Sequence, residues 1–160
     1  MFTMTRLVNL QAEALDMEAL EFLVRKAITD TENRGKLQRT MAQLIDCISS
    51  SSLSSNPMVW SCFADFYLGI GDGTTELEYR QKQQRALLAE TSPDWKQNVP
   101  KFETLAEASI ILVDCLVREG DSKSMFAAKT QLNSIVKQAE SLYSENEWYA
   151  KLQAKQAELQ

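Results

Sequence analysis

The chain has 160 residues, of which 44% are hydrophobic and 24% are charged, proportions close to those of an ordinary folded domain. It contains no histidine, which excludes a Ser-His-Asp triad, a Cys-His pair and a His-ligated metal site within these residues. The formal net charge is −5 and no run of Lys or Arg is present, so we do not expect a nucleic-acid partner. Nothing in the composition points to an enzyme or to a cofactor.

Three widely spaced cysteines, Cys47, Cys62 and Cys115, predict reduced thiols and not a disulfide framework. The longest apolar run, residues 109–117, is interrupted by Asp114 and is far shorter than the ~20 residues that cross a bilayer. The first six residues lack the apolar stretch of a secretory signal. These features favour a cytoplasmic or nuclear protein with no membrane partner.

Apolar residues spaced three and four apart predict a first helix near 11–30 and a second near 34–49. The serine-rich tract that follows, up to residue 55, is expected to be a loop. Asn56 and Pro57 are a typical N-cap and first helical residue. They predict a third helix that runs to about residue 68 and ends at three closely spaced glycines.

A fourth helix, near 74–91, has the weakest pattern, because only Leu77, Leu87 and Leu88 suggest a buried stripe. Residues 92–93, Ser-Pro, mark a turn or an N-cap. A helix near 101–119 is apolar on two sides and is therefore expected to lie between neighbours. A buried strand over 110–117 is rejected because the helical periodicity extends well beyond the length of a strand.

Gly120 suits the left-handed residue that ends a helix, and Asp121 or Ser122 suits the cap of the next, which we expect near 122–143. Its predicted buried face includes Leu132 and Leu142. A tail helix near 145–159 is supported by Glu147 and Lys151, which are four residues apart. The chain thus predicts an all-α fold of six to seven helices.

The first helices of three predicted hairpins share a pattern of large, apolar, small and aromatic or polar residues. The pattern is Leu20, Leu23, Val24 and Ala27 in a loose copy, Trp60, Phe63, Ala64 and Tyr67 in the clearest copy, and Phe102, Leu105, Ala106 and Ser109 in the third. A bulky residue can fill the space between hairpins, while a small one lets two helices approach closely. The hairpins are expected at 11–49, 57–91 and 101–143, within one domain that covers 1–160.

This pattern resembles the first helix of a tetratricopeptide repeat, although the copies are about 40 residues apart and that repeat has about 34. The resemblance implies a right-handed array of antiparallel helical hairpins, an α-solenoid. A HEAT-like array and an ordinary six-helix bundle with accidental spacing remain open alternatives.

A second resemblance covers roughly the last two-thirds of the chain. The segment Trp60-Ser-Cys-Phe-Ala-Asp-Phe-Tyr, followed by an Asp-Trp stretch and then Lys-Phe-Glu, is similar to the C-terminal part of the tetratricopeptide repeat protein 27 family. The matching residues of the later stretch are Asp94, Trp95, Val99, Lys101, Phe102 and Glu103. The resemblance implies a non-catalytic scaffold linked to chaperone-assisted complex assembly, with protein partners or further repeats of a larger chain as neighbours. A self-assembling or hetero-oligomeric helical subunit with no peptide-binding role is the alternative.

Trp95, Lys96 and Lys101 are the candidate partner contacts, because aromatic residues dominate binding hot spots. The competing interpretation, which we favour, is that Trp95 folds back to cover the hydrophobic end between hairpins. Arg25 and Lys26, together with these lysines, do not form a convincing clamp for a chaperone's terminal carboxylate.

Acidic residues outside the repeat pattern have no neighbours that suggest catalysis. Glu76 and Glu78 are expected on a solvated face, as are Asp30 and Glu32. Asp114 is expected to pair with the residue four positions on, Arg118, or to face a concave groove. No metal site is expected.

Overall fold

A computed structural model describes residues 8–9, 14–15, 17–91 and 94–160 of the chain. The chain forms two compact units, Met1–Ala86 and Leu87–Gln160. In the described residues all elements are helical except one antiparallel pair of two-residue strands, so the all-α prediction is confirmed. The single domain of three hairpins and the right-handed sense of the array stay predictions. No helix among the described residues is long and apolar enough to span a membrane.

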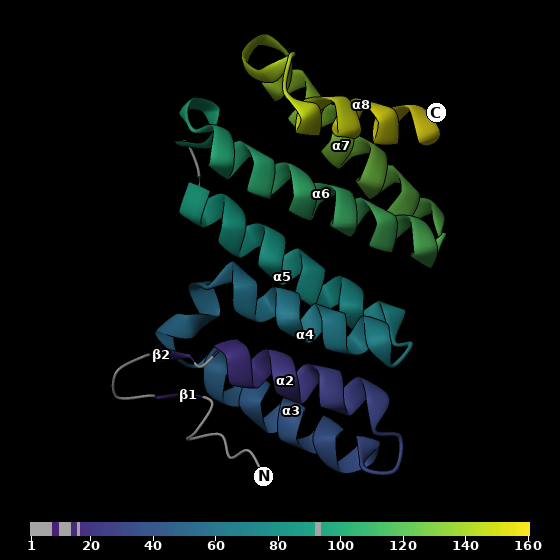
Figure 1. Cartoon of the computed structure of the whole chain (residues 1–160). Helices are drawn as coiled ribbons and strands as arrows, with labels where there is room; N and C mark the ends of the chain where they lie inside the picture. Colours follow the sequence, from purple (N-terminus) through teal and green to yellow (C-terminus); the bar gives the residue numbers. More distant parts are fainter. Residues whose placement is uncertain (1–7, 10–13, 16, 92–93) are drawn as a thin grey trace. The chain divides into compact units, whose positions relative to one another are not determined.

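The described helices number seven and follow one another through short connections (Figure 1). They are α2 (Met17–Thr29), α3 (Arg34–Ser49), α4 (Pro57–Gly69), α5 (Gly73–Thr91), α6 (Val99–Glu119), α7 (Ser122–Tyr143) and α8 (Glu147–Glu158). Two short 3-10 helices, η1 (Ser52–Ser55) and η2 (Asp94–Gln97), and the strands β1 (Val8–Asn9) and β2 (Ala14–Leu15) complete the described elements.

The first helix begins later than the sequence predicts. We expected it near residue 11, but α2 begins at Met17, because Ala14 and Leu15 pair with β1 in an antiparallel ladder. The other predicted helices match closely in number, order and bounds. The turn or cap predicted at residues 92–93 lies outside the described residues.

In the first unit, α2 lies beside both α3 and α4 (Figure 1). Its contact with α4 is close at Gly69, where a Cβ atom would collide with the side chain of Ile28. Gly69 is the last residue of α4 and not a residue beyond its end, as the sequence suggested. The absence of a side chain at Gly69 therefore permits the close approach of these two helices.

The serine-rich tract is more ordered than the expected loop. Ser51 caps η1 by accepting a hydrogen bond from the backbone N–H of Leu53. The side chain of Leu53 is buried and supplies the apolar anchor that a purely polar tract would lack. Asn56 then caps α4, with Pro57 as its first residue, as predicted.

The buried face of α5 differs from the apolar stripe that the sequence suggested. Leu87 is buried as predicted, but Leu77 is only partly buried and Leu88 is 40% exposed. Tyr79 is buried between two aromatic rings of α4. The Tyr79 ring stacks on Trp60, with centroids 5.8 Å apart, and on Tyr67 at 5.4 Å. Large rings, in place of a row of leucines, therefore join α4 to the N-terminal part of α5.

The same face of α5 buries charge, so our expectation that Glu76 lies on a solvated surface is wrong. Glu76 is fully buried, and its Oε2 accepts a hydrogen bond from Arg80 Nε at 3.2 Å. Arg80 is 4% exposed and also donates, through Nη2, to Oδ1 of Asp65 on α4 at 2.8 Å. A carboxylate on each side thus compensates the buried guanidinium.

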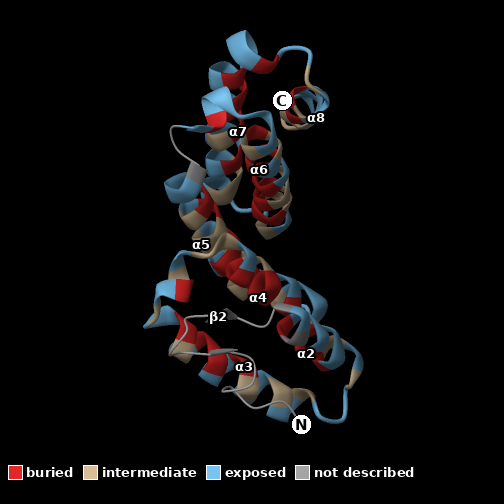
Figure 2. Cartoon of the chain, turned by 60° about the vertical axis from the view of Figure 1, so that its left-hand side comes forward, coloured by how far each residue is buried: buried red, intermediate tan, exposed pale blue. Residues whose placement is uncertain are grey.

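In the second unit, α6 lies against both α7 and α8, and its buried residues extend from Phe102 to Leu116 (Figure 2). This agrees with the prediction that a helix apolar on two sides lies between neighbours. Gly120 ends α6 in the left-handed conformation, with φ of 75°, and Asp121 caps α7 by accepting from the N–H of Ser124. The opposite side of α7 is exposed, and Leu142, expected in the core, is 47% exposed.

Candidate protein-binding groove

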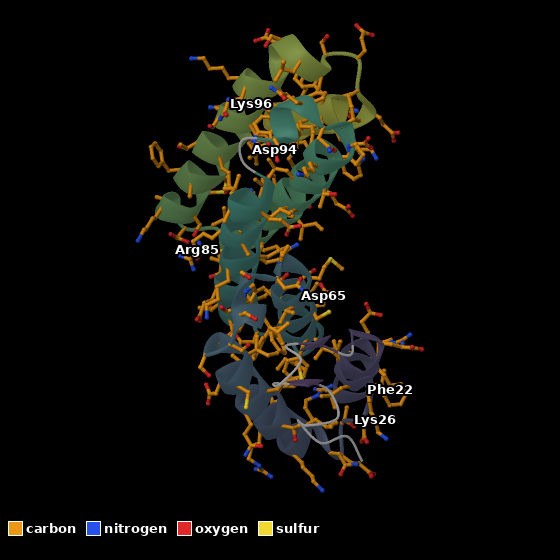
Figure 3. The ribbon with its side chains drawn as sticks, turned by 90° about the vertical axis from the view of Figure 1, so that its left-hand side faces the viewer. Phe22, Lys26, Asp65, Arg85, Asp94 and Lys96 are labelled. Carbon is orange, nitrogen blue, oxygen red and sulfur yellow. The ribbon has the colours of Figure 1, made fainter. Side chains whose placement is uncertain are left out.

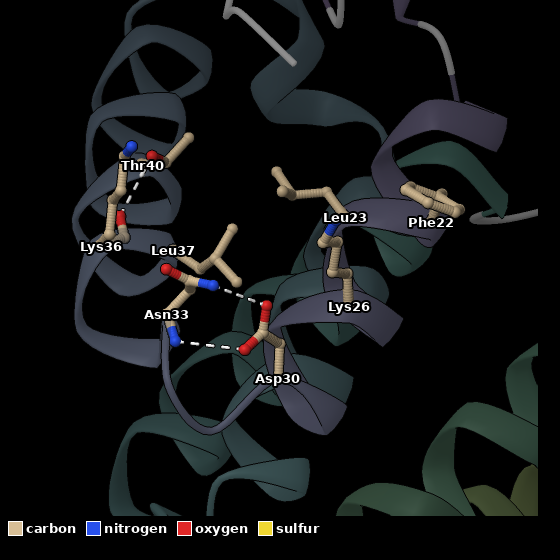
Figure 4. Close-up of a pocket in the computed structure, with 8 residues that line it drawn as sticks. All are labelled: Phe22, Leu23, Lys26, Asp30, Asn33, Lys36, Leu37 and Thr40. Atoms are coloured by element: carbon tan, nitrogen blue, oxygen red, sulfur yellow. Dashed lines mark hydrogen bonds between the residues drawn. The ribbon is translucent and has the colours of Figure 1, made fainter. Parts of the chain in front are cut away.

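A groove of about 430 Å³ lies between α2 and α3 in the first unit. Figure 4 shows that α2 and the turn after it supply one side and α3 the other. Its lining side chains are Phe22, Leu23, Lys26, Asp30, Asn33, Lys36, Leu37 and Thr40. The α2 helix presents these residues because Phe22 and Lys26 lie one turn apart, next to the buried stripe that begins with Leu20.

The groove combines an apolar base with charged rims. Leu23 and Leu37 contribute the apolar surface, and Phe22, 46% exposed, adds an aromatic ring at the edge. Lys26 projects from α2 (Figures 3 and 4) and Lys36 from α3 (Figure 4), and both are exposed. An apolar base between two cations suits an amphipathic peptide that carries an acidic side chain.

The closed end of the groove is held by Asp30 and Asn33. The side-chain amide of Asn33 donates to Asp30 Oδ2 at 2.9 Å, and the Asn33 backbone N–H donates to Oδ1 at 3.2 Å. These hydrogen bonds from Asn33 hold the pKa of Asp30 below its ordinary value. Asp30 is therefore ionised at neutral pH and fixes the turn that joins the two walls.

The predicted repeat residues form the cores of the two units and do not line the groove, apart from Leu23. In the first unit, Trp60, Phe63 and Ala64 are buried, and Tyr67 is partly buried. In the second unit, Phe102, Leu105 and Ala106 are buried. The indole N–H of Trp60 donates to the carbonyl of Ser54 at 2.7 Å, which joins α4 to the serine tract.

The three predicted partner contacts lie around η2 in the second unit. Trp95 is 4% exposed, stacks against Phe102 with centroids 6.0 Å apart, and accepts a hydrogen bond at its carbonyl from the hydroxyl of Tyr143 at 2.5 Å. The structure thus places Trp95 over the apolar end of the α6–α7 pair and not as an exposed anchor. Lys96 lies 5.8 Å from the Trp95 ring centroid, and Lys101 pairs with Asp94 at 3.3 Å. That these lysines contact a partner stays a prediction.

Asp114 forms an ion pair with a residue of another helix. Its Oδ1 lies 2.8 Å from Nζ of Lys155 on α8, whereas the guanidinium of Arg118 donates to its backbone carbonyl. The pair joins α6 to α8, and with Glu158 it raises the pKa of Lys155 above its ordinary value through hydrogen bonds. The predicted pair between Glu147 and Lys151 is present at 3.0 Å.

Residue patterns alone missed the groove. Phe22 falls outside the apolar stripe of α2, and an apolar residue that breaks the polar face of an amphipathic helix is the signal that could have indicated it. Lys36 gave no such signal, because single lysines on a polar helix face are ordinary. Only the pairing of α2 with α3 brings Phe22 and Lys36 to one opening.

Among the described side chains no group of three or more His, Cys, Asp or Glu residues could hold a metal ion. The three cysteines are free thiols. Burial, with nearby Glu21 and Asp65, raises the pKa of Cys62 to about 12, so this thiol is a poor nucleophile at neutral pH.

Comparison with known proteins supports the resemblance drawn from the sequence. The chain is 25% identical over 114 residues, 71% of its length, to the tetratricopeptide repeat protein 27 homolog of Dictyostelium discoideum. The aligned region is 13% of that protein, so the chain spans a small part of the relative it matches. No family model and no solved structure matches the chain. With its all-helical fold, this similarity shows a distant relationship between the chain and the tetratricopeptide repeat protein 27 family.

Proposed function

We propose that this chain is a non-catalytic protein-interaction scaffold, part of a helical repeat array whose neighbours are further repeats of a longer protein. The relative it resembles is named for tetratricopeptide repeats, which are protein-binding modules. We further propose that the scaffold acts in chaperone-assisted complex assembly, in the cytoplasm or nucleus, as the family resemblance implies. Its partners are proteins, and not nucleic acids or membranes.

The groove between α2 and α3 is the observation that carries this proposal. Its apolar base, Leu23 and Leu37, accepts one apolar side chain of a partner segment, and Lys26 and Lys36 face the opening from opposite walls. Leu23 belongs to the core stripe of α2, so the base is fixed by the packing of the first unit. The preferred ligand is a short amphipathic segment in which an acidic residue lies beside an apolar one.

A displayed peptide library selected against the full chain tests this proposal. We expect enrichment of segments that combine an apolar and an acidic residue. Lys26→Glu and Lys36→Glu each reverse one charge at the groove and should weaken the selected peptides about tenfold or more. The matched controls are Arg25→Glu on α2 and Arg39→Glu on α3, which are exposed cations outside the groove lining.

The comparison of these four variants decides the outcome. Equal loss in the groove variants and the controls would show attraction by general charge and would contradict a groove-specific site. Enrichment of peptides that lack acidic residues would contradict the assigned chemistry. Failure to enrich any peptide would contradict the scaffold function of this segment.

Self-association is the second candidate function, and one exposed aromatic residue favours it. Phe126 on α7 is 72% exposed, which is unusual for a phenylalanine in a monomeric domain. Light scattering over a range of concentrations should show dimers that Phe126→Ser abolishes if α7 is a contact between copies. A constant monomer mass for the unaltered chain would exclude this function.

A further inference from the structure

A second groove in the first unit lies between the serine tract and α5, and it has a different chemistry from the groove described above. Its volume is about 380 Å³ and it is open to solvent. Its lining residues are Ser49, Ser54, Ser55, Trp60, Lys82, Arg85 and Ala86. This lining contains two cations and no carboxylate, in a chain whose net charge is −5.

Aromatic rings hold Lys82 in place. Its Nζ lies 4.9 Å from the ring centroid of Trp60 and 5.1 Å from that of Tyr79. The nearest carboxylate oxygen in an ion pair belongs to Glu78, 3.8 Å away, and the Glu78 side chain is 60% exposed. A long, exposed pair of this kind contributes little, so a bound anion can compete with Glu78 for the ammonium group.

Arg85 provides the second charge, three residues further along α5 (Figure 3). It is exposed and makes no ion pair with any residue that the structure describes. The buried Arg80, by contrast, is already engaged in ion pairs with Asp65 and Glu76. The planar guanidinium of Arg85 can therefore donate two parallel hydrogen bonds to an incoming carboxylate or phosphate.

The opposite wall is fixed by hydrogen bonds to backbone carbonyls. The hydroxyls of Ser49 and Ser55 donate to the carbonyls of Ile45 and Ser52, each at 2.8 Å. The carbonyl of Ser54 accepts the indole N–H of Trp60 at 2.7 Å. These bonds stabilise the serine tract in the conformation that forms this wall of the groove.

We propose that this groove binds an acidic side chain, a carboxylate or a phosphate, on a segment of a protein partner. Lys82 supplies a positioned point charge and Arg85 supplies paired donors, with the serine tract as the fixed wall. The proposal rests on the proposed function in one respect, namely that the partner is a protein. It concerns a separate site and residues that the α2–α3 groove does not use.

Nuclear magnetic resonance of the full chain tests this site directly. The three tryptophans give three indole N–H signals, of which only that of Trp60 comes from the groove lining. We would titrate three peptides that differ at one position, which is glutamate, phosphoserine or glutamine, and a short single-stranded oligonucleotide. We expect the glutamate and phosphoserine peptides to shift the Trp60 signal, with smaller effects at high salt, while the signals of Trp95 and Trp148 stay in place.

Variants on α5 then assign the chemistry. Lys82→Gln and Arg85→Gln should each weaken the acidic peptides about fivefold to tenfold, and Glu78→Gln should strengthen them because it removes the competing carboxylate. Arg39→Gln, an exposed cation of the same unit outside the groove, is the control and should have no effect. Preference for phosphoserine over glutamate, or the reverse, identifies the source of the anion.

Three outcomes would overturn the proposal. The first is equal binding of the glutamine peptide, the second is tighter binding of the oligonucleotide, and the third is an equal loss in Arg39→Gln and Arg85→Gln. Loss of peptide binding in Lys26→Glu and Lys36→Glu, with no response of Trp60 to acidic peptides, would support the scaffold function while refuting this site. The two proposals can therefore fail separately.

Discussion

Helices α5 and α7 are each the second helix of a predicted hairpin, but the buried face of α7 is apolar and that of α5 is largely polar and charged. In α7 the inward positions are apolar, and they include Ala128, Leu132 and Ile135. In the part of α5 that belongs to the first unit the buried positions are Glu76, Tyr79, Arg80 and Gln84, and one leucine, Leu87, is buried beyond them. One architecture thus accepts either apolar packing or a compensated charge at the same structural position.

The two faces differ in how a single substitution changes the free energy of unfolding. Burial of Leu132 removes apolar surface from water and stabilises the fold directly. Burial of Arg80 requires its desolvation, which the carboxylates of Asp65 and Glu76 offset, so the net gain is small. Removal of a single partner, however, leaves a charge in the core. Single substitutions in the polar face of α5 should therefore destabilise the fold by more than the small net stabilisation that the intact charge network provides.

The largest effect is expected from Arg80→Met, which keeps much of the side-chain volume but removes the cation beside Glu76. We expect the free energy of unfolding of the first unit to fall by about 3–5 kcal/mol. Denaturant titration followed by the Trp60 indole signal measures this change. The matched control is Arg85→Met on the same helix, which is exposed and should change stability by less than about 0.5 kcal/mol.

A double variant sharpens this test. Glu76→Leu combined with Arg80→Met replaces the charges with apolar groups and should recover most of the lost stability. If Arg80→Met costs no more than Arg85→Met, the buried network does not hold α5 against α4. If the double variant is less stable than Arg80→Met alone, the other interactions of Glu76 outweigh its bond to Arg80.

For the apolar face of α7, Leu132→Ala should destabilise the second unit by about 2–5 kcal/mol, because Leu132 is fully buried. Leu142→Ala on the same helix is the control, with an expected change below about 0.5 kcal/mol. Thermal or denaturant unfolding measures both. Similar losses in the two variants would mean that the C-terminal turn of α7 packs as the apolar periodicity suggested and not as the structure shows.

Two glycines of the first unit differ in the space around them, so substituting each by alanine tests how closely the helices pack. Gly69→Ala places a methyl group against Ile28 and should destabilise the α2–α4 contact by about 1–3 kcal/mol. Gly35→Ala, in the first turn of α3, meets no atom within 4 Å and should stabilise the chain by about 0.4–1 kcal/mol. Opposite signs are expected in unfolding experiments, and a stabilising Gly69→Ala would refute the close approach.

The contrast between the two helices also explains what the sequence could predict. The apolar periodicity of α7 predicted its bounds and most of its buried face, because apolar residues at helical spacing have one favourable environment. The same reasoning placed Glu76 in solvent and chose Leu77 and Leu88 for the core of α5. A charged residue becomes a core residue only when opposite charges compensate it. Glu76 is paired with Arg80, and Arg80 is also paired with Asp65, which lies 15 positions earlier on α4.

The two candidate grooves could not be predicted from the sequence for a related reason. Their walls come from different helices, so the proximity of Lys26 to Lys36, or of Ser54 to Arg85, depends on tertiary packing. Its aromatic character makes Trp95 a candidate interface residue, but the structure buries it against Phe102 and Tyr143, in agreement with the favoured interpretation that it folds back onto apolar surface. Residue type alone does not separate an anchor for a partner from an anchor for the fold.

The smallest expected effect concerns the stacked tyrosine of α5 at high pH. Burial, assisted by Tyr67, Glu78 and Asp46, raises the pKa of Tyr79 to about 12. Tyrosine in an unfolded chain ionises near pH 10, so the folded state retains a proton that the unfolded state loses. The stabilisation is fully present below pH 10 and is lost as the pH rises from about 10 to 12. At pH 10.5 the loss should be below about 1 kcal/mol.

Tyr79→Phe tests this expectation, because phenylalanine keeps the stacking surface but cannot ionise. The comparison is made in a Cys62→Ala background, because the raised pKa of Cys62 in the same unit causes an alkaline loss of its own. In that background, unfolding free energies at pH 8 and pH 10.5 should move closer together in Tyr79→Phe, with a residual fall from Tyr67, whose pKa burial also raises. Lys155→Gln serves as the control for the second unit, where the raised pKa of Lys155 gives the same sign. If Tyr79→Phe retains the full alkaline loss of the unaltered chain, the ionisation of Tyr79 is not coupled to folding, and the aromatic stack between α4 and α5 is open to water.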